Sequence, residues 1–264
     1  MKLGLGTVQF GCNYGISNKN GQVPLEEVSK ILGVAYNNGI DVLDTAQAYG
    51  TSEKTLGEFD LSKFKVVTKI VDPNSTIETS LSNLKIESLY GLMLHHEDMI
   101  NDSIWKTFQS YKEQKLVKKI GISVYNPEVL LDIINNYDID IVQFPLNLFD
   151  QRFIEILPCL KEKNIEIHTR STFLQGLLLM NASNINKYFD EIKNNIMSIP
   201  EPRLVHCLQF IKNISEVDKI IVGATNCNEL KQIIESFNSE IEKFDYNKLK
   251  IDDKKYILPQ NWRV

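Results

Sequence analysis

The stretch Leu-Asp-Thr-Ala-Gln-Ala-Tyr-Gly-Thr-Ser-Glu-Lys-Thr-Leu-Gly, residues 43–57, decides how the fold of this chain is interpreted. It begins in a short apolar run that ends at Asp44 and continues through a loop that carries Tyr49. Ser52 and Glu53 follow, a pair that indicates the start of a helix. A strand, a loop and a helix in this order form one βα unit. The stretch therefore predicts an acid and a phenol at the carboxyl end of a strand.

The same alternation of short apolar runs and longer amphipathic segments extends over the whole chain. The runs are apolar on both sides of the pleat, as expected for strands covered by helices. The predicted strands are Leu3–Leu5, Val42–Asp44, Val66–Lys69, Leu89–Leu94, Ile120–Ser123, Ile141–Phe144, Ile165–Thr169 and Ile220–Val222. The predicted helices are Leu25–Asn37, Ser52–Phe59, Ile77–Leu84, Ser103–Gln114, Pro127–Asn136, Phe153–Glu162, Glu201–Lys212 and Asn228–Phe237. Eight strands alternating with eight helices predict an α/β fold of the (β/α)8 TIM barrel type.

Length and composition agree with one large domain. A chain of 264 residues, 43% of them hydrophobic, can bury roughly three quarters of its unfolded surface in a single core. No stretch rich in Pro, Gly or Ser divides the sequence. We therefore expect one barrel domain over residues 1–264, with a C-terminal tail of about 238–264 packing on the barrel.

Charge, cysteines and hydropathy narrow the possible partners and the compartment. The net charge of -5 gives no electrostatic reason to expect nucleic acid as a partner. The four cysteines form no CxxC pair, which favours reduced thiols in a cytoplasmic protein. No apolar run has the length of a signal peptide or a bilayer span. We therefore expect a cytoplasmic protein with a small-molecule partner and without membrane contact; the sequence indicates no oligomeric state.

Glycines near the N-terminus offer one alternative interpretation. Gly4, Gly6 and Gly11 follow the first predicted strand and suggest a dinucleotide-binding fingerprint. In the GxGxxG pattern the third glycine would occupy position 9, which is Gln9. The spacing fails, so a tight turn at the strand end is favoured over a Rossmann fold.

A second alternative comes from His95-His96-Glu97-Asp98, four potential metal ligands in a row. They would suit a metal-dependent hydrolase, which stoichiometric zinc in an elemental analysis would reveal. Adjacent residues of a strand point to opposite faces, however, so the two histidines cannot both face one ion. We predict no metal site and expect only His95 to face a pocket.

The strongest signal is the convergence of four side chains on one end of three neighbouring strands. Asp44 ends the second strand, Tyr49 follows it, Lys69 ends the third strand and His95 follows the fourth. In a TIM barrel the active site forms at this end. A buried structural ion pair between Asp44 and Lys69 is the alternative, but such pairs are costly to bury.

These residues resemble the aldo-keto reductase family. The family's Asp-Thr-Ala, Tyr-Gly, Ser-Glu and Leu-Gly pattern is present from Asp44 to Gly57. The resemblance implies a catalytic tetrad of Asp44, Tyr49, Lys69 and His95. It implies an NAD(P)-dependent oxidoreductase that reduces an aldehyde, ketone or sugar carbonyl to an alcohol. Tyr49 would be the general acid, and Lys69 is expected to lower its pKa. The alternative is a non-catalytic, cofactor-sensing regulatory subunit of the same fold.

The resemblance also implies a nicotinamide cofactor, NADPH or NADH. The residues expected to bind it are Gly6, Thr7, Asp44, Ser123, Gln143, Arg170, Ser171, Gly176, Gly223, Ala224, Thr225 and Glu229. Arg170 stands where the family usually has an aromatic ring that stacks on nicotinamide, and Val124 replaces an asparagine. Glu229 stands near the place of an arginine that grips the 2′-phosphate of NADPH. We therefore predict weakened NADPH preference, with NADH accepted comparably or better, unless Lys231 replaces that arginine.

The substrate is less well indicated. Tyr14, Gln47, Arg170 and Gln175 would make the mouth of the barrel polar. A polar mouth favours sugars or hydroxylated carbonyls as substrates.

Overall fold

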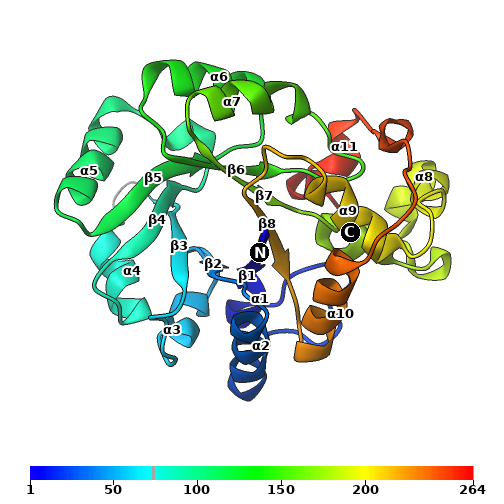
Figure 1. The fold of residues 1–264 in the computed structure, drawn as a ribbon, viewed down its shortest axis with the longest axis horizontal. Helices are drawn as coiled ribbons and strands as arrows, with labels where there is room; N and C mark the ends of the chain where they lie inside the picture. Colours follow the sequence, from blue (N-terminus) through cyan, green and yellow to red (C-terminus); the bar gives the residue numbers. More distant parts are fainter. Residues whose placement is uncertain (73–74, 264) are drawn as a thin grey trace.

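Eight short strands pair in chain order, each parallel to the next, and the eighth pairs with the first to close a barrel. The computed structural model describes residues 1–72 and 75–263. In Figure 1 the strands lie in the middle of the molecule and the helices surround them. The strands are β1 (Leu3–Gly6), β2 (Val42–Asp44), β3 (Lys65–Ile70), β4 (Leu89–Leu94), β5 (Val117–Ser123), β6 (Ile141–Pro145), β7 (Glu166–Arg170) and β8 (Lys219–Gly223). They follow the eight predicted apolar runs, so the predicted (β/α)8 barrel is confirmed.

The helices that cover the strands also follow the predicted order. They are α2 (Leu25–Asn37), α3 (Ser52–Leu56), α4 (Ile77–Leu84), α5 (Asp102–Glu113), α6 (Pro127–Asn136), α7 (Leu157–Glu162), α9 (Arg203–Lys212) and α10 (Cys227–Asn238). Short helices that were not predicted are α1 (Val8–Gly11), α8 (Lys193–Met197) and α11 (Lys254–Ile257). The 3-10 segments are η1 (Glu97–Met99), η2 (Ile154–Ile156), η3 (Leu174–Leu179), η4 (Ala182–Asn184), η5 (Lys187–Ile192), η6 (Tyr246–Leu249) and η7 (Pro259–Asn261).

Prolines explain two differences from the predicted helices. The segment predicted as one helix from Phe153 divides into η2 and α7, and Pro158 lies in the first turn of α7. Proline lacks the N–H that a helix interior needs, so it is favoured at a helix start. The helix predicted from Glu201 begins at Arg203, because a residue that precedes a proline is disfavoured in helical conformation.

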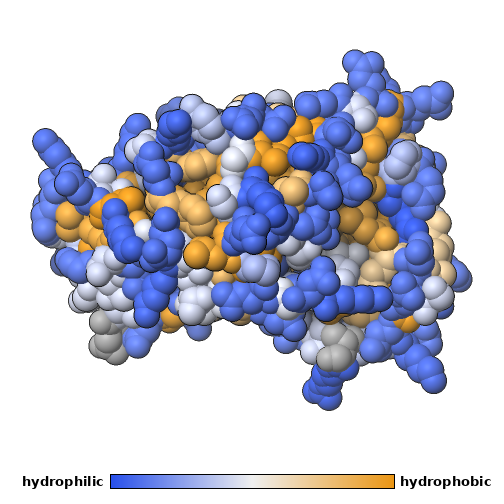
Figure 2. Space-filling view, turned by 90° about the horizontal axis from the view of Figure 1, so that it is seen from below, coloured by the Kyte–Doolittle hydropathy of each residue, from blue (hydrophilic) through white to orange (hydrophobic). Residues whose placement is uncertain are grey.

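The helices turn apolar faces to the barrel and polar faces outward. In α2 the buried residues are Val28, Ile31, Leu32 and Ala35, at the spacing of one helix face. Figure 2 shows the molecule from below in the view of Figure 1, with hydrophilic side chains predominating and hydrophobic patches between them. Among the described residues, no helix combines the length and the apolar character that a membrane crossing would require.

The amino end of the barrel interior is filled by a charged network. Glu166, the first residue of β7, accepts hydrogen bonds from the Tyr90 hydroxyl at 2.6 Å and from His168 Nε2 at 2.7 Å. Lys119 donates to the same carboxylate. The interior also holds an apolar cluster that includes Met93 and Ile141.

The C-terminal segment lies against the loops that follow β6 and β7. Ile251 N donates to the carbonyl of Phe149 at 2.9 Å, and the Tyr256 hydroxyl donates to Glu191 at 2.6 Å. Tyr256 and Ile257 are buried. These contacts support our proposal of one domain with a tail packed on the barrel; Val264 lies outside the described residues.

Candidate active site

A cavity of about 670 Å³ opens at the carboxyl end of the barrel. The predicted site residues on its wall are Gly6, Thr7, Asp44, Tyr49, His95, Arg170, Ser171, Gly176, Gly223, Ala224, Thr225 and Glu229. Lys69, Ser123 and Gln143 are buried and do not form part of the wall. Gln47 is also absent from it, because its amide donates to the Thr76 carbonyl and to Ser80.

Asp44 and Lys69 form a buried ion pair at the ends of β2 and β3. Lys69 Nζ lies 2.7 Å from Asp44 Oδ1 and donates to the Thr45 carbonyl at 2.9 Å. The two side chains are 4% and 1% exposed, respectively. Burial lowers the pKa of Lys69, and the Asp44 charge opposes that shift. A buried pair of this kind contributes little net stability, so its position beside an open cavity favours a chemical role.

Tyr49 is held over this pair by the close approach of two backbone segments. Its hydroxyl lies 3.5 Å from Lys69 Nζ. A Cβ at Gly11, the last residue of α1, would lie 1.7 Å from the Tyr49 carbonyl oxygen. Gly50 has a φ of 56°, and a Cβ there would lie 2.3 Å from the Gly11 carbonyl oxygen. Only glycine fits at both positions, so the crossing of these segments fixes where Tyr49 lies.

The electrostatics of Tyr49 differ from the prediction. Burial raises the pKa of the phenol well above its usual value, the Asp44 carboxylate adds to this effect, and Arg170 opposes it. The net shift is therefore upward, opposite to the lowering expected from Lys69, because burial and the Asp44 charge outweigh the effect of the ammonium. The lysine ammonium lies nearer to Asp44 than to the phenol, so the carboxylate largely neutralises its charge. Tyr49 consequently keeps its proton near neutral pH, which is the form a general acid requires.

His95 stands beside Tyr49, with ring centroids 5.7 Å apart and the rings nearly perpendicular at 79°. Burial lowers the pKa of His95 to about 3, with further lowering by the charges of Lys69, His96 and Arg170. The imidazole is therefore neutral at ordinary pH. Its Nδ1 is buried and has no hydrogen-bond partner among the described residues. His95 can therefore offer a polar atom to a ligand in the cavity.

His95 and His96 do not point to opposite sides as strictly as predicted. His95 lines the cavity and His96 does not, but their rings stack at 4.9 Å with an angle of 9°. The strand β4 ends at Leu94, so the alternation of a strand does not extend to these residues. Over residues 1–72 and 75–263, no three His, Cys, Asp or Glu side chains are grouped to hold a metal ion.

Ser123 and Gln143 form a second polar corner beneath the cavity. They face each other in the register of β5 and β6. Gln143 Nε2 donates to Asp44 Oδ2 at 2.8 Å, which fixes the amide orientation because a carboxylate only accepts. Gln143 Oε1 and Ser123 Oγ are buried without partners among the described residues. An unpaired acceptor beside a hydroxyl is complementary to a primary carboxamide, so the corner fits the nicotinamide of the implied cofactor.

Thr7 and Ser52 connect the cavity wall to the loop of Tyr49. The Thr7 hydroxyl donates to the Asp44 carbonyl at 3.0 Å and lies 2.9 Å from Ser52 Oγ. Its hydrogen-bonding capacity is used within the protein. Although Thr7 lines the cavity, its hydroxyl therefore supports the Asp44 backbone.

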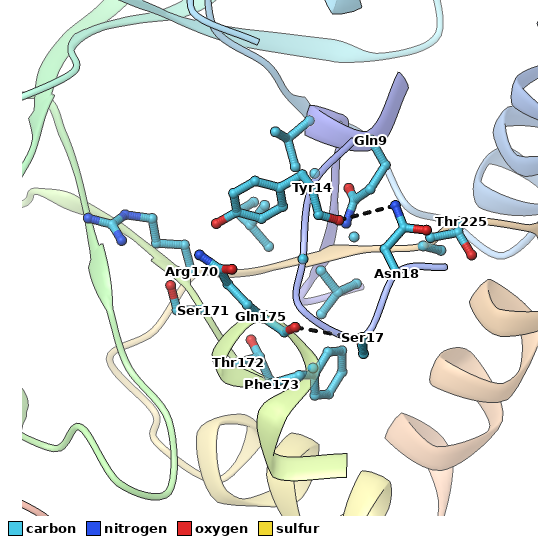
Figure 3. A pocket seen from close by; sticks show the side chains of 18 of the residues that line it. Gln9, Tyr14, Ser17, Asn18, Arg170, Ser171, Thr172, Phe173, Gln175 and Thr225 are labelled. Carbon is cyan, nitrogen blue, oxygen red and sulfur yellow. Dashed lines mark hydrogen bonds between the residues drawn. The ribbon is translucent and has the colours of Figure 1, made fainter. Parts of the chain in front are cut away.

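One side of the cavity is formed by a loop that was not predicted. Residues 12–22 follow α1 and cross toward the loop after β7, where Ser17 Oγ donates to the Gln175 carbonyl at 3.5 Å. Figure 3 shows the Tyr14 ring and Ser17 of this loop on the side of the segment from Arg170 to Gln175, whereas Asn18 lies on the side of Thr225. The available signal was the length of the polar segment before Pro24, which exceeds the usual βα loop of about 2–6 residues.

Tyr125 is a further wall residue that was not predicted. The Arg170 guanidinium carbon lies 4.1 Å from the centroid of its ring. The Tyr125 ring also stacks with His96 at 6.4 Å and 15°. No sequence motif marks this position, since an aromatic residue after a strand is equally typical of core packing.

The start of α10 already carries two carboxylates. Glu229 turns back to accept from Thr225 N at 2.7 Å and from Thr225 Oγ1 at 2.8 Å. Glu27, from α2, accepts from Cys227 N at 2.8 Å. Backbone N–H groups at a helix start are the usual place for a phosphate. Here carboxylates from the protein occupy two of them.

Comparisons with known proteins agree with this geometry. The sequence model described as "Aldo/keto reductase family" matches residues 2–253. The chain is 27% identical over 278 residues to the uncharacterized oxidoreductase YqkF of Bacillus subtilis (strain 168), covering 90% of this chain and 89% of that protein.

Solved structures show the same barrel. The holo form of aldo-keto reductase AKR11C1 from Bacillus halodurans superimposes with a TM-score of 0.77 at 17% identity, covering 94% of this chain and 90% of that one. The glycerol dehydrogenase AKR11B4 from Gluconobacter oxydans gives a TM-score of 0.68 at 20% identity, covering 91% and 88%. At these identities the superpositions show a common fold, whereas the family assignment rests on the match along the sequence. The protein is an NAD(P)-dependent oxidoreductase that belongs to the aldo-keto reductase family.

Proposed function

We propose that this chain reduces the carbonyl group of a small aldehyde, ketone or sugar to an alcohol, with Tyr49 as the general acid. The observation that carries this proposal is the position of Tyr49 on the cavity wall, with its hydroxyl 3.5 Å from the Nζ of a buried lysine that Asp44 holds at 2.7 Å. The family to which the chain belongs uses NAD(P)H for carbonyl reduction, and the bound cofactor supplies the hydride.

Each side chain then has a separate role. Tyr49 gives its proton to the carbonyl oxygen as the alcohol forms. Lys69 stabilises the phenolate that remains, and Asp44 fixes the position of the ammonium. His95, neutral because its pKa is about 3, donates a hydrogen bond that orients the carbonyl. In the oxidative direction Tyr49 acts as the base.

The polar corner of Ser123 and Gln143 supports a site for the carboxamide of nicotinamide. Its two unpartnered atoms offer a hydroxyl and an amide oxygen, and Gln143 is anchored to Asp44. Val124, which stands where the family has an asparagine, is buried and has no polar side-chain atom to add. The cofactor-binding set thus extends from this corner along the wall from Gly6 to Glu229.

We further propose that NADH is accepted at least as well as NADPH. A 2′-phosphate near the start of α10 would approach the carboxylates of Glu229 and Glu27, which occupy backbone N–H groups there. Like charges at short distance repel. Lys231, the possible replacement for the family's arginine, is exposed and does not line the cavity.

Activity is tested with a panel of small aldehydes, ketones and sugars, each with NADH and NADPH. We expect consumption of the reduced cofactor and formation of one equivalent of alcohol. Tight cofactor binding without turnover of any carbonyl would favour the regulatory alternative instead. Stoichiometric zinc in an elemental analysis, without consumption of the reduced cofactor, would favour the metal-dependent hydrolase.

The cofactor preference is tested by kcat/KM and by equilibrium dissociation constants for both cofactors. Glu229→Gln should shift the ratio toward NADPH by roughly 3–10-fold, because one repulsive charge is removed. Glu235→Gln, at an exposed position on the same helix, removes the same charge and should leave the ratio unchanged. A hundredfold advantage for NADPH, unaffected by Lys231→Ala, would contradict the proposal.

A further inference from the structure

Arg170 carries a guanidinium group that no carboxylate among the described residues pairs within 4 Å. Arg152 and Arg203 each form an ion pair at 2.8 Å with an acid two positions earlier in the chain. The guanidinium of Arg170 instead lies over the ring of Tyr125, with one long hydrogen bond of 3.5 Å to the Val124 carbonyl. Since Arg170 lines the cavity, its charge is available to a ligand.

The guanidinium is also held in a defined orientation. A stack of rings connects it to the candidate active site: His95 on His96 at 4.9 Å, His96 on Tyr125 at 6.4 Å, and Tyr125 beneath Arg170 at 4.1 Å. Stacking covers one face of the guanidinium and leaves its N–H groups free in the plane. That edge is the part that binds a carboxylate through two parallel hydrogen bonds.

The other charges on the wall do not cancel that of Arg170. Asp44 is neutralised by Lys69 at 2.7 Å. Glu229 is bonded to Thr225 at the start of α10. His95 is neutral at ordinary pH. The region around Tyr49 and His95 therefore has a net positive charge.

We infer that Arg170 binds a carboxylate group of the substrate, so that the substrate class is an aldehyde or ketone that also carries a carboxylate. This inference rests on the proposed reduction. The carboxylate takes part in no bond making: hydride adds to the carbonyl carbon, the Tyr49 proton goes to the oxygen, and the carboxylate leaves unchanged. Tyr14, whose hydroxyl points toward the Arg170 side of the cavity in Figure 3, is placed to donate a further hydrogen bond.

The test compares 4-oxobutanoate with its uncharged methyl ester. In the wild type we expect kcat/KM for the acid to exceed that for the ester by roughly 10–100-fold, the size of a charge-assisted hydrogen-bonded pair. Arg170→Met should remove this advantage through KM, so that kcat/KM for the acid falls by roughly 10–100-fold more than kcat/KM for the ester. Arg170→Lys keeps the charge without the planar fork and should retain only part of the advantage.

Two controls separate this role from others. Lys19 also lines the cavity and is exposed, so Lys19→Met should leave the acid-to-ester ratio unchanged if the recognition is specific. Because Arg170 also stands among the residues expected to bind the cofactor, the Kd for NADH is measured by fluorescence in the wild type and in Arg170→Met, and the acid-to-ester ratio should fall by more than any rise in that Kd. A large rise in that Kd, with equal losses for both substrates, would mean that Arg170 serves the cofactor and would overturn the inference.

The inference and the proposed function can fail separately. Equal kcat/KM for acid and ester in the wild type, with normal turnover, overturns the inference and leaves the reductase intact. If no carbonyl compound is reduced, the proposed function fails, and Arg170 is judged by calorimetric binding of butanoate and butanamide. Butanoate should then bind at least about tenfold more tightly in the wild type and lose that advantage in Arg170→Met; equal binding overturns the inference.

Discussion

The two ends of the barrel interior both hold buried charges, but they satisfy them differently. At the amino end, the Glu166 carboxylate accepts from Tyr90, His168 and Lys119. At the carboxyl end, Ser123 Oγ, Gln143 Oε1 and His95 Nδ1 are buried without partners among the described residues. The amino end has its own exception in His168 Nδ1, but at the carboxyl end the unpaired Nδ1 belongs to His95, which lines the cavity.

This difference teaches how to separate a structural network from a binding site. Buried polar groups are normally paired within the protein, so each unpaired one needs an explanation. A network that closes on itself contributes to folding and specifies one arrangement of the strands. Atoms left unpaired beside a cavity are expected to pair with a ligand. Changes at the amino end should therefore affect stability, and changes at the carboxyl end should affect chemistry.

The largest expected effect contrasts two tyrosines, one at each end of the barrel interior. Tyr49→Phe should lower kcat by roughly 10²–10⁴-fold because the proton donor is lost, with little change in melting temperature. Tyr90→Phe, at the amino end, should leave kcat unchanged and destabilise the fold by about 1–2 kcal/mol, because a hydrogen bond to a charged group is lost. Steady-state kinetics and thermal unfolding measure both. Wild-type turnover in Tyr49→Phe, where chemistry limits the rate, would exclude Tyr49 as the acid.

The next effect concerns the centre of the amino-end network. Burial would raise the pKa of Glu166, but the hydrogen bonds from His168, Lys119 and Tyr90 outweigh it and hold the pKa well below its usual value. The stability that Glu166 contributes is therefore present above about pH 4.3 and is lost as the pH falls below it. Glu166→Gln should cost roughly 2–3 kcal/mol at pH 7, since buried donors lose their acceptor. Denaturant unfolding measures this cost, and a neutral result would show that the network is not structural.

A smaller effect is expected at the carboxyl end, where His95 should make the stability of the fold depend on pH. The pKa of His95 in the folded protein is about 3, against about 6.5 when unfolded. Stability should therefore fall as the pH drops below 6.5, with a slope of up to about 1.4 kcal/mol per pH unit. His95→Asn should flatten this slope. Burial also lowers the pKa of His206, so His206→Asn is the matched control. If the slope of stability against pH is unchanged in His95→Asn, His95 titrates normally in the folded protein.

The smallest effect should come from Ser123. Ser123→Ala removes an unpaired buried hydroxyl, so the melting temperature should be unchanged or slightly raised. The Kd for NADH should rise by roughly 3–10-fold, the equivalent of one hydrogen bond. Fluorescence titration measures the affinity. A clear loss of stability with unchanged affinity would place Ser123 with the structural network instead.

The sequence predicts best what depends on local pattern. Asp44 is the last residue of β2 as predicted, and Lys69 lies one residue before the end of β3, because the apolar runs mark where each strand stops to within a residue. Their side-chain pairing and burial follow from the parallel register of β2 and β3. The order of strands and helices can be predicted from the alternation of short apolar runs and longer amphipathic segments alone.

What could not be predicted depends on contacts between distant segments. The pKa of Tyr49 follows from its burial, which no motif reports. The stacking of His95 on His96 arises just beyond the end of β4, where alternation no longer applies. The placement of Tyr125 beneath Arg170 joins loops after different strands. Glu27 reaches the start of α10 from a helix far away in the sequence.

The crossing of Gly11 and Gly50 has a consequence for how this enzyme can be changed. The position of Tyr49 is set by contact between two backbones, which side-chain substitutions elsewhere do not replace. The parts of the wall that would distinguish substrates, around Tyr14, Tyr125 and Arg170, belong to other segments. Substrate range can therefore diversify under selection, natural or in the laboratory, while the proton donor stays where it is. Libraries that randomise those segments and spare both glycines should keep a high fraction of active variants.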